Sequence, residues 1–489
     1  MMRGSRNQQG EEDVQTPFLQ TSGIQDPPPF SVQGLRFKWL VWGLVGVLEL
    51  TFETGLAMRT TPLIASYKEH LCAKTSRGVD TPIINCQRDH SIASELALIL
   101  GVFQLLECLP MLLLSGIYGN MADKYGRRPI LFLSYLGLVL SSMWTTGVVW
   151  LVPRMPLKLV WIGPVFTLIG GGASVSLAIL MTSAAAVAPS TQRVSVFSFI
   201  HGTALVAAIL GFGLSSATMA SLGNYAAQLV GLALMSLALC LSLLLPTGEA
   251  AHPLASDPEL DSTSEYTNIL VSNRHAVIRS YNDLLQIRNT IPLLIAGFFA
   301  TLGQRVQILI LLYMPEQFSI SFSEANTFII LDHVSNLLVL FIGLPLANVL
   351  ILRWWNFNSR RKDIALALIS SALSLAGALL LSFAPNVTAA FFGIIVFGTG
   401  IGLSSLLQSI FVGLFPLERA AFATTLISTI KSVGGTFSGP VYSYVFALSL
   451  DLDRVLQGLP FIVSAACFVI VASVLITMAK TPRVRRDIM

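Results

Sequence analysis

Long apolar runs separated by short polar segments dominate the chain. Each run is close to or above the roughly 20 residues that a helix needs to cross a hydrocarbon core of about 30 Å. The runs lie at residues 39–58, 94–117, 129–151, 159–187, 196–218, 225–246, 291–314, 327–352, 364–384, 388–412, 421–447 and 458–479. This pattern predicts an all-α membrane protein with twelve transmembrane helices.

The twelve runs divide into two equal sets around a polar segment, residues 247–290. The halves 39–246 and 291–480 match in number of runs, which favours an internal duplication. We therefore expect two pseudo-symmetric six-helix bundles around a central cavity, joined by a cytosolic linker at 247–290. Residues 1–38 hold no apolar run and are predicted to be a disordered cytosolic tail. Residues 481–489 are predicted to form a short cytosolic tail.

Composition supports this class, because 54% of the residues are apolar and only 11% are charged, against about 25% charged in soluble domains. The net charge of +4 comes from basic residues in short clusters between apolar runs, so we expect no nucleic-acid partner. Most Lys and Arg residues fall on the side that carries both termini. The positive-inside rule therefore predicts cytosolic termini, in the plasma membrane or, alternatively, the vacuolar membrane.

The segment between the second and third runs reads Gly-Asn-Met-Ala-Asp-Lys-Tyr-Gly-Arg-Arg. It closely resembles the G-x-x-x-D-[RK]-x-G-R-[RK] signature of the major facilitator superfamily, in the loop where that family carries it. Glycine permits a tight turn, and aspartate can accept from amides at a helix N-terminus. A merely solvated basic loop would explain the charges but not the glycine and aspartate spacing. The predicted gating residues are Gly119, Asp123, Lys124, Gly126, Arg127 and Arg128.

This resemblance implies a transporter that moves a small organic solute by alternating access. In the family, the aspartate of the signature locks the cytosolic face in the outward-open state. The equivalent loop of the second half, residues 353–363, keeps only basic residues from the pattern, so we expect an asymmetric lock. The polar segment 67–72, predicted to lie in an outer loop, is similar to fungal transporters grouped with the folate and haem carriers.

Ionisable side chains inside spans are expensive and are candidates for function. Glu49 and Glu53 lie one turn apart in the first span, Glu107 in the second, Arg305 in the seventh and Lys431 in the eleventh. The resemblance implies that the first span lies opposite the seventh and the second beside the eleventh. With the matched depth of these residues, it predicts the cross-bundle pairs Glu53–Arg305 and Glu107–Lys431. Such pairs could be permanent ion pairs that hold the two halves together. Alternatively, a carboxylate could take up a proton when its partner moves away and so couple proton movement to transport.

Other polar residues in the spans have less certain roles. Gln104 and Gln304 can offer neutral donors and acceptors to a substrate. Asp332 and His333 are expected near the outer end of the eighth span, where water reaches them, which favours a structural role. The glycines at 170–172 could serve either tight helix packing or bending.

Cys72 and Cys86 share the one long outer loop that the pattern predicts. Because that loop faces an oxidising compartment, we predict a disulfide between them, with two free thiols as the alternative.

Together these features predict a proton-coupled secondary transporter of a small organic solute. An uncoupled facilitator and a receptor or sensor built on a transporter fold are the alternatives. The sequence holds no phosphate-binding loop and no catalytic constellation at a recognisable spacing, so we expect no enzymatic activity, no cofactor and no metal. The expected partners are the small-molecule substrate, protons and membrane lipid, and the protein is expected to act as a monomer.

Overall fold

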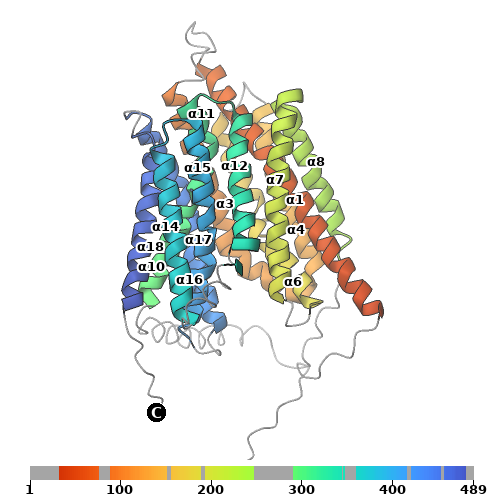
Figure 1. The fold of residues 1–489 in the computed structure, drawn as a ribbon. Helices are drawn as coiled ribbons and strands as arrows, with labels where there is room; N and C mark the ends of the chain where they lie inside the picture. Colours follow the sequence, from red (N-terminus) through yellow and green to blue (C-terminus); the bar gives the residue numbers. More distant parts are fainter. Residues whose placement is uncertain are drawn as a thin grey trace, which may run out of the picture.

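The structure is a computed structural model, in which every regular element of the described residues is a helix. The helices stand side by side as a tall bundle (Figure 1). We call the end where the first helix finishes the upper end, and the end where the last helix finishes the lower end. The described residues are 32–75, 89–150, 156–188, 193–246, 290–343, 345–346, 359–415, 420–452 and 456–480.

The first half supplies six spans, of which the fourth is divided. Its helices are α1 (Val32–Thr75), α3 (His90–Tyr125), α4 (Arg127–Trp150), η1 (Leu157–Ile162), α5 (Gly163–Phe166), α6 (Ala173–Ala186), α7 (Arg193–Leu222) and α8 (Asn224–Ser242). Within this half α1 packs closely on α7 and α8. A Cβ at Gly55 of α1 would lie 2.6 Å from the carbonyl oxygen of Gly231 of α8, so the close approach of these two helices requires glycine.

The second half also supplies six spans, two of which contain a short 3₁₀ interruption. Its helices are α10 (Thr290–Gln304), η3 (Arg305–Leu309), α11 (Ile310–Phe318), α12 (Phe322–Leu338), the π-helical η4 (Val339–Gly343), α14 (Ser359–Ser382), α15 (Val387–Gly398), η5 (Thr399–Gly402), α16 (Leu403–Val412), α17 (Ala420–Ser449) and α18 (Leu459–Lys480). Ten of the described helical stretches are long and apolar enough to span a membrane. With the divided fourth span and the 30-residue α17, they form the predicted twelve-helix, two-bundle layout.

The fourth span is broken rather than continuous over 159–187 as predicted. Gly170, Gly171 and Gly172 have φ values of 86°, 78° and 74°, a backbone conformation that residues with a Cβ rarely adopt. A Cβ at Gly170 would also lie 2.3 Å from the backbone nitrogen of Ser134. The glycine run therefore ends one helical segment and lets the chain pass close to α4 before α6 begins.

The first span is much longer than predicted, because α1 runs for 44 residues and continues through Pro62. Residues 32–38 are helical rather than part of a tail, and residues 67–72 are helical rather than an outer loop. The two cations that interrupt the apolar pattern are both engaged. Arg59 donates to α4, and Lys68 pairs with Glu316 of α11. These partners explain how charged residues fit in a continuous helix.

Two other boundaries differ from the prediction. The signature segment is not a free loop, because α3 continues to Tyr125 and the chain turns only at Gly126, whose φ is 93°. The eighth span begins at Phe322, so Asp332 lies inside α12 and is only 1% exposed. The expectation that water reaches Asp332 is therefore wrong.

Some predictions fall on parts of the chain outside the described residues. These are the N-terminal tail up to residue 31, the linker at 247–289, the C-terminal tail at 481–489, most of the second-half loop at 353–358, and Cys86. They stay predictions.

Candidate functional site

The two halves meet mainly where α3 packs on α17 and where α7 packs on α12. Along α3, a Cβ at Gly101 would lie 2.5 Å from the hydroxyl oxygen of Ser443. One turn further along, a Cβ at Gly439 of α17 would lie 2.6 Å from Oε1 of Gln104. Glycine on each helix therefore permits close contact, and it places the predicted substrate residue Gln104 against the opposite half.

A buried hydrogen-bond cluster joins α1, α7 and α12 toward the upper end. Asn326 has no exposed surface, accepts from the hydroxyl of Thr61, and donates to the carbonyl of Phe212 at 3.3 Å and the hydroxyl of Ser216 at 3.0 Å. Ser216 donates to the carbonyl of Ser323 at 2.8 Å, and Ser323 donates back to the carbonyl of Ser216 at 3.2 Å. Every one of these bonds crosses between the halves, so the cluster holds this part of the interface together.

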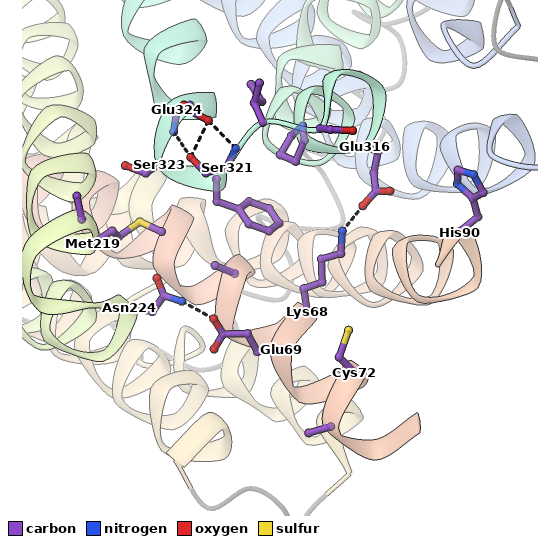
Figure 2. A pocket seen from close by; sticks show the side chains of 17 residues that line it. Lys68, Glu69, Cys72, His90, Met219, Asn224, Glu316, Ser321, Ser323 and Glu324 are labelled. Carbon is purple, nitrogen blue, oxygen red and sulfur yellow. Dashed lines mark hydrogen bonds and ion pairs between the residues drawn. The ribbon is translucent and has the colours of Figure 1, made fainter. Parts of the chain in front are cut away.

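A cavity of about 1420 Å³ opens beside this cluster and is lined by both halves. Figure 2 shows Lys68 of α1 directed at Glu316 of α11 across the cavity. Nearby, Asn224 of α8 donates to Glu69 at 2.8 Å. The cavity therefore has charged walls and an ion pair between the halves.

The two predicted carboxylates of α1 lie on one face of the helix. Glu49 is 4% exposed and Glu53 is half-buried, and the two interact electrostatically with each other and with Tyr135 of α4. Phe52 stacks on the Tyr135 ring at 4.3 Å. Among the described residues, neither carboxylate has a hydrogen-bond or ion-pair partner. The structure thus brings together two acidic groups that no cation of the described residues contacts.

Neither predicted cross-bundle ion pair is present between the described side chains. The Nζ atom of Lys431 lies 3.4 Å from both the carbonyl oxygen of Ser404 and Oε1 of Gln408, within its own half. Glu107 instead lies within electrostatic range of Arg59. Matched depth fixes the height of a side chain in the membrane but not the direction in which it leaves the helix, which is why the prediction failed for this conformation.

Arg59 is a buried cation that the sequence analysis placed outside the first span. It is 7% exposed, and its Nη2 donates to the carbonyl of Ser142 at 3.2 Å and to Oγ1 of Thr145 at 2.7 Å. Its Nε has no partner in the part of the chain that the structure describes. The moderately apolar residues after Arg59 were the available signal that the helix continues.

Asp332 forms a second buried acidic site that sequence reasoning treated as structural. Its Oδ2 accepts from Nε2 of Gln307 at 2.8 Å and from Nδ2 of Asn336 at 3.1 Å. Its Oδ1 is buried and has no partner among the described residues. His333 places Nδ1 3.6 Å from Oδ2 and 2.9 Å from the carbonyl of Ile329. The pattern of neutral donors around one carboxylate could not be read from the sequence.

The remaining predicted residues are placed as follows. Gln304 donates to the carbonyl of Gly400 at 3.4 Å, inside its own half. Lys124 lies over the ring of Tyr125 at the lower end of α3, whereas the side chain of Asp123 lies outside the described part. Cys72 is disulfide-bonded, and because its predicted partner is also outside that part, the pairing stays a prediction.

The family model described as the Major Facilitator Superfamily matches residues 81–440. The chain belongs to this superfamily. Its fungal relatives include the MFS efflux pump atnC of Emericella nidulans, which is 28% identical over 93% of this chain and 92% of its own length. The efflux pump ustT of Aspergillus flavus is 25% identical over 80% of this chain and 79% of its own length. Membrane transport of small solutes, expected from the signature segment, is thereby confirmed.

Solved superfamily structures share the fold at low sequence identity. The nucleoside transporter NupG aligns with a TM-score of 0.60 at 13% identity, over 90% of this chain and 100% of its own. A D-xylose–proton symporter aligns with a TM-score of 0.60 at 14% identity, over 90% and 97%. These likenesses confirm the superfamily fold predicted for the chain.

Proposed function

We propose that this protein exports a small organic solute from the cytosol by alternating access, and that protons drive the export. Two relatives that align with most of this chain are named efflux pumps, which supports the direction. The positive-inside pattern supports a lower end that faces the cytosol. On that orientation, the Asn326 cluster and the Lys68–Glu316 pair join the halves at the outer end, which supports access from the cytosol in this conformation. The plasma membrane is the proposed location.

The observation that carries proton coupling is the pair Glu49 and Glu53. Two carboxylates one turn apart repel each other when both are charged, so the pair favours a state in which one holds a proton. No cation among the described residues contacts them, and Glu53 is only half-buried at the side of α1. A proton bound here would neutralise one charge, and its release would restore repulsion that a change of conformation can relieve.

The test is counterflow in proteoliposomes with and without a proton gradient, over a panel of labelled small organic solutes. A coupled exporter should accumulate at least one solute against its gradient only when protons flow the other way. Exchange of labelled for unlabelled solute should continue without the gradient. Exchange that never leads to accumulation would identify an uncoupled facilitator. The absence of exchange for any solute would favour the receptor or sensor.

A further inference from the structure

We propose that Arg305 binds a carboxylate or sulfonate group of the transported solute, so that the substrate class is organic anions. The proposal rests on the transport function proposed above and names the chemistry of its substrate.

Arg305 lies at a depth in the membrane where a charged side chain is not stable in contact with lipid. It starts η3, the interruption near the middle of the 29-residue span Thr290–Phe318, and an arginine at mid-membrane is costly unless it faces a polar space. Its side chain is exposed. Its Nε lies 3.9 Å from where a Cβ on Gly435 of α17 would be, and it interacts electrostatically with the thiol of Cys108 of α3. The guanidinium therefore points toward the interface between the halves.

The charge of Arg305 is not neutralised by the described residues. It forms no ion pair or hydrogen bond among them. Glu107 has Arg59 in electrostatic range, Asp332 accepts from neutral amides, and Glu53 forms no ion pair with Arg305 among the described side chains. A cation that no anion of the described chain contacts is suited to an anion supplied by the ligand.

A close contact between the halves lies just above Arg305. The contact between Gln104 and Gly439 lies one turn from Cys108 on α3, on the side toward the upper end. A solute that enters the interface from the lower end would meet Arg305 just below this contact. The guanidinium presents a rigid planar fork that matches a carboxylate in two hydrogen bonds, which a lysine cannot reproduce.

Cys108 provides a reporter for this charge, because its thiol is free and partly exposed. We would compare its reaction with two methanethiosulfonates of similar size, one bearing a sulfonate and one a trimethylammonium group, and read the modified Cys108 peptide by mass spectrometry. Glu107 also acts electrostatically on this thiol, but it is present in every variant compared. The ratio of the anionic to the cationic rate should therefore fall at least about fivefold in Arg305→Gln, because the loss of one nearby unit charge changes the two rates in opposite directions. Arg305→Lys should keep the ratio.

Lys431→Gln is the matched control, because that lysine points toward α16 in its own half, and it should leave the ratio unchanged. Benzoate should slow the modification of Cys108 in the parent protein and fail to do so in Arg305→Gln, whereas benzamide should have no effect in either. An unchanged ratio in Arg305→Gln, an unreactive Cys108, or equal effects of benzoate and benzamide would overturn the proposal. Because labelling does not measure transport, this failure would be distinct from a failure of the counterflow test.

Discussion

Lys68 of α1 and Glu316 of α11 form an ion pair across the two halves at the upper end (Figure 2). Both side chains are nearly buried, at 9% and 10% exposed. Removal of one partner leaves the other charge without compensation, at a cost of up to about 3 kcal/mol for a pair that is partly reached by water. Lys68→Met and Glu316→Gln should therefore shift the population toward a separated upper end.

Pulsed electron paramagnetic resonance can measure this separation as the distance between spin labels at Leu222 and Phe383. These residues lie at the upper ends of the two halves, and their side chains are 69% and 56% exposed. Each single variant should increase the long-distance population. The double variant should increase it less, because no charge is left stranded. Identical distance distributions in the parent and both single variants would show that the ion pair does not hold the upper end closed.

Asn326 should contribute more to this closure than any one of its partners. Asn326→Leu leaves the hydroxyl of Thr61 without its acceptor and removes the bonds that Asn326 donates to Phe212 and Ser216, and an unsatisfied buried group costs about 1–3 kcal/mol. The same label pair should therefore report a more separated upper end. Asn224→Leu is the control, because Asn224 bonds only within the first half. If both leucine variants give the distance distribution of the parent protein, the Asn326 cluster does not hold the upper end closed.

The number and order of the spans could be predicted from the sequence, because crossing the membrane requires an apolar run of a fixed length. The ends of the spans could not. The charge of Arg59 ended the apparent run at residue 58, but α1 continues there because Arg59 bonds to Ser142 and Thr145 of α4, which lie 83 and 86 residues away in the sequence. The break at Gly170–Gly172 depends on φ values that three glycines allow but do not require.

The candidate site could also be predicted only in part. The sequence gives the depth of a side chain in the membrane but not the direction in which it leaves its helix. The sequence correctly selected Glu49 and Glu53 as neighbours on one helix face, since spacing alone determines that relation. It could not show that Lys431 turns toward Gln408 or that Asp332 is enclosed by the amides of its own half. Those features depend on how the helices rotate and pack, which a single sequence does not reveal.

The signature segment contains two glycines with different requirements. Gly126 has a φ of 93°, and a side chain in that region costs about 1–3 kcal/mol. Gly119 is helical, and a Cβ there would meet nothing within 4 Å. Gly126→Ala should lower the thermal transition of the purified protein, whereas Gly119→Ala should leave it unchanged or raise it slightly. Equal transitions for the two variants would mean that the turn tolerates a side chain.

The carboxylates of α1 and α3 should respond differently to neutralisation. Glu53→Gln and Glu49→Gln remove the proton site but strand no cation, because neither has an ion-pair partner in the described chain. In proteoliposomes, gradient-driven accumulation should fail in at least one of them, while exchange of labelled for unlabelled solute survives. Full accumulation in both variants would exclude this pair as the proton carrier.

Glu107→Gln should impair both activities for a different reason. Among the described residues it leaves the buried Arg59 with no carboxylate in electrostatic range and with only the neutral partners Ser142 and Thr145, which disfavours the buried charge. Arg59→Gln together with Glu107→Gln removes both charges, so exchange should return toward the parent level even though Lys431 is untouched. Lys431→Met combined with Glu107→Gln should bring no such recovery, because Lys431 bonds to Ser404 and Gln408 rather than to Glu107. If exchange instead recovers in the combination of Glu107→Gln with Lys431→Met and not in the combination with Arg59→Gln, Glu107 and Lys431 pair in another conformation of the transport cycle.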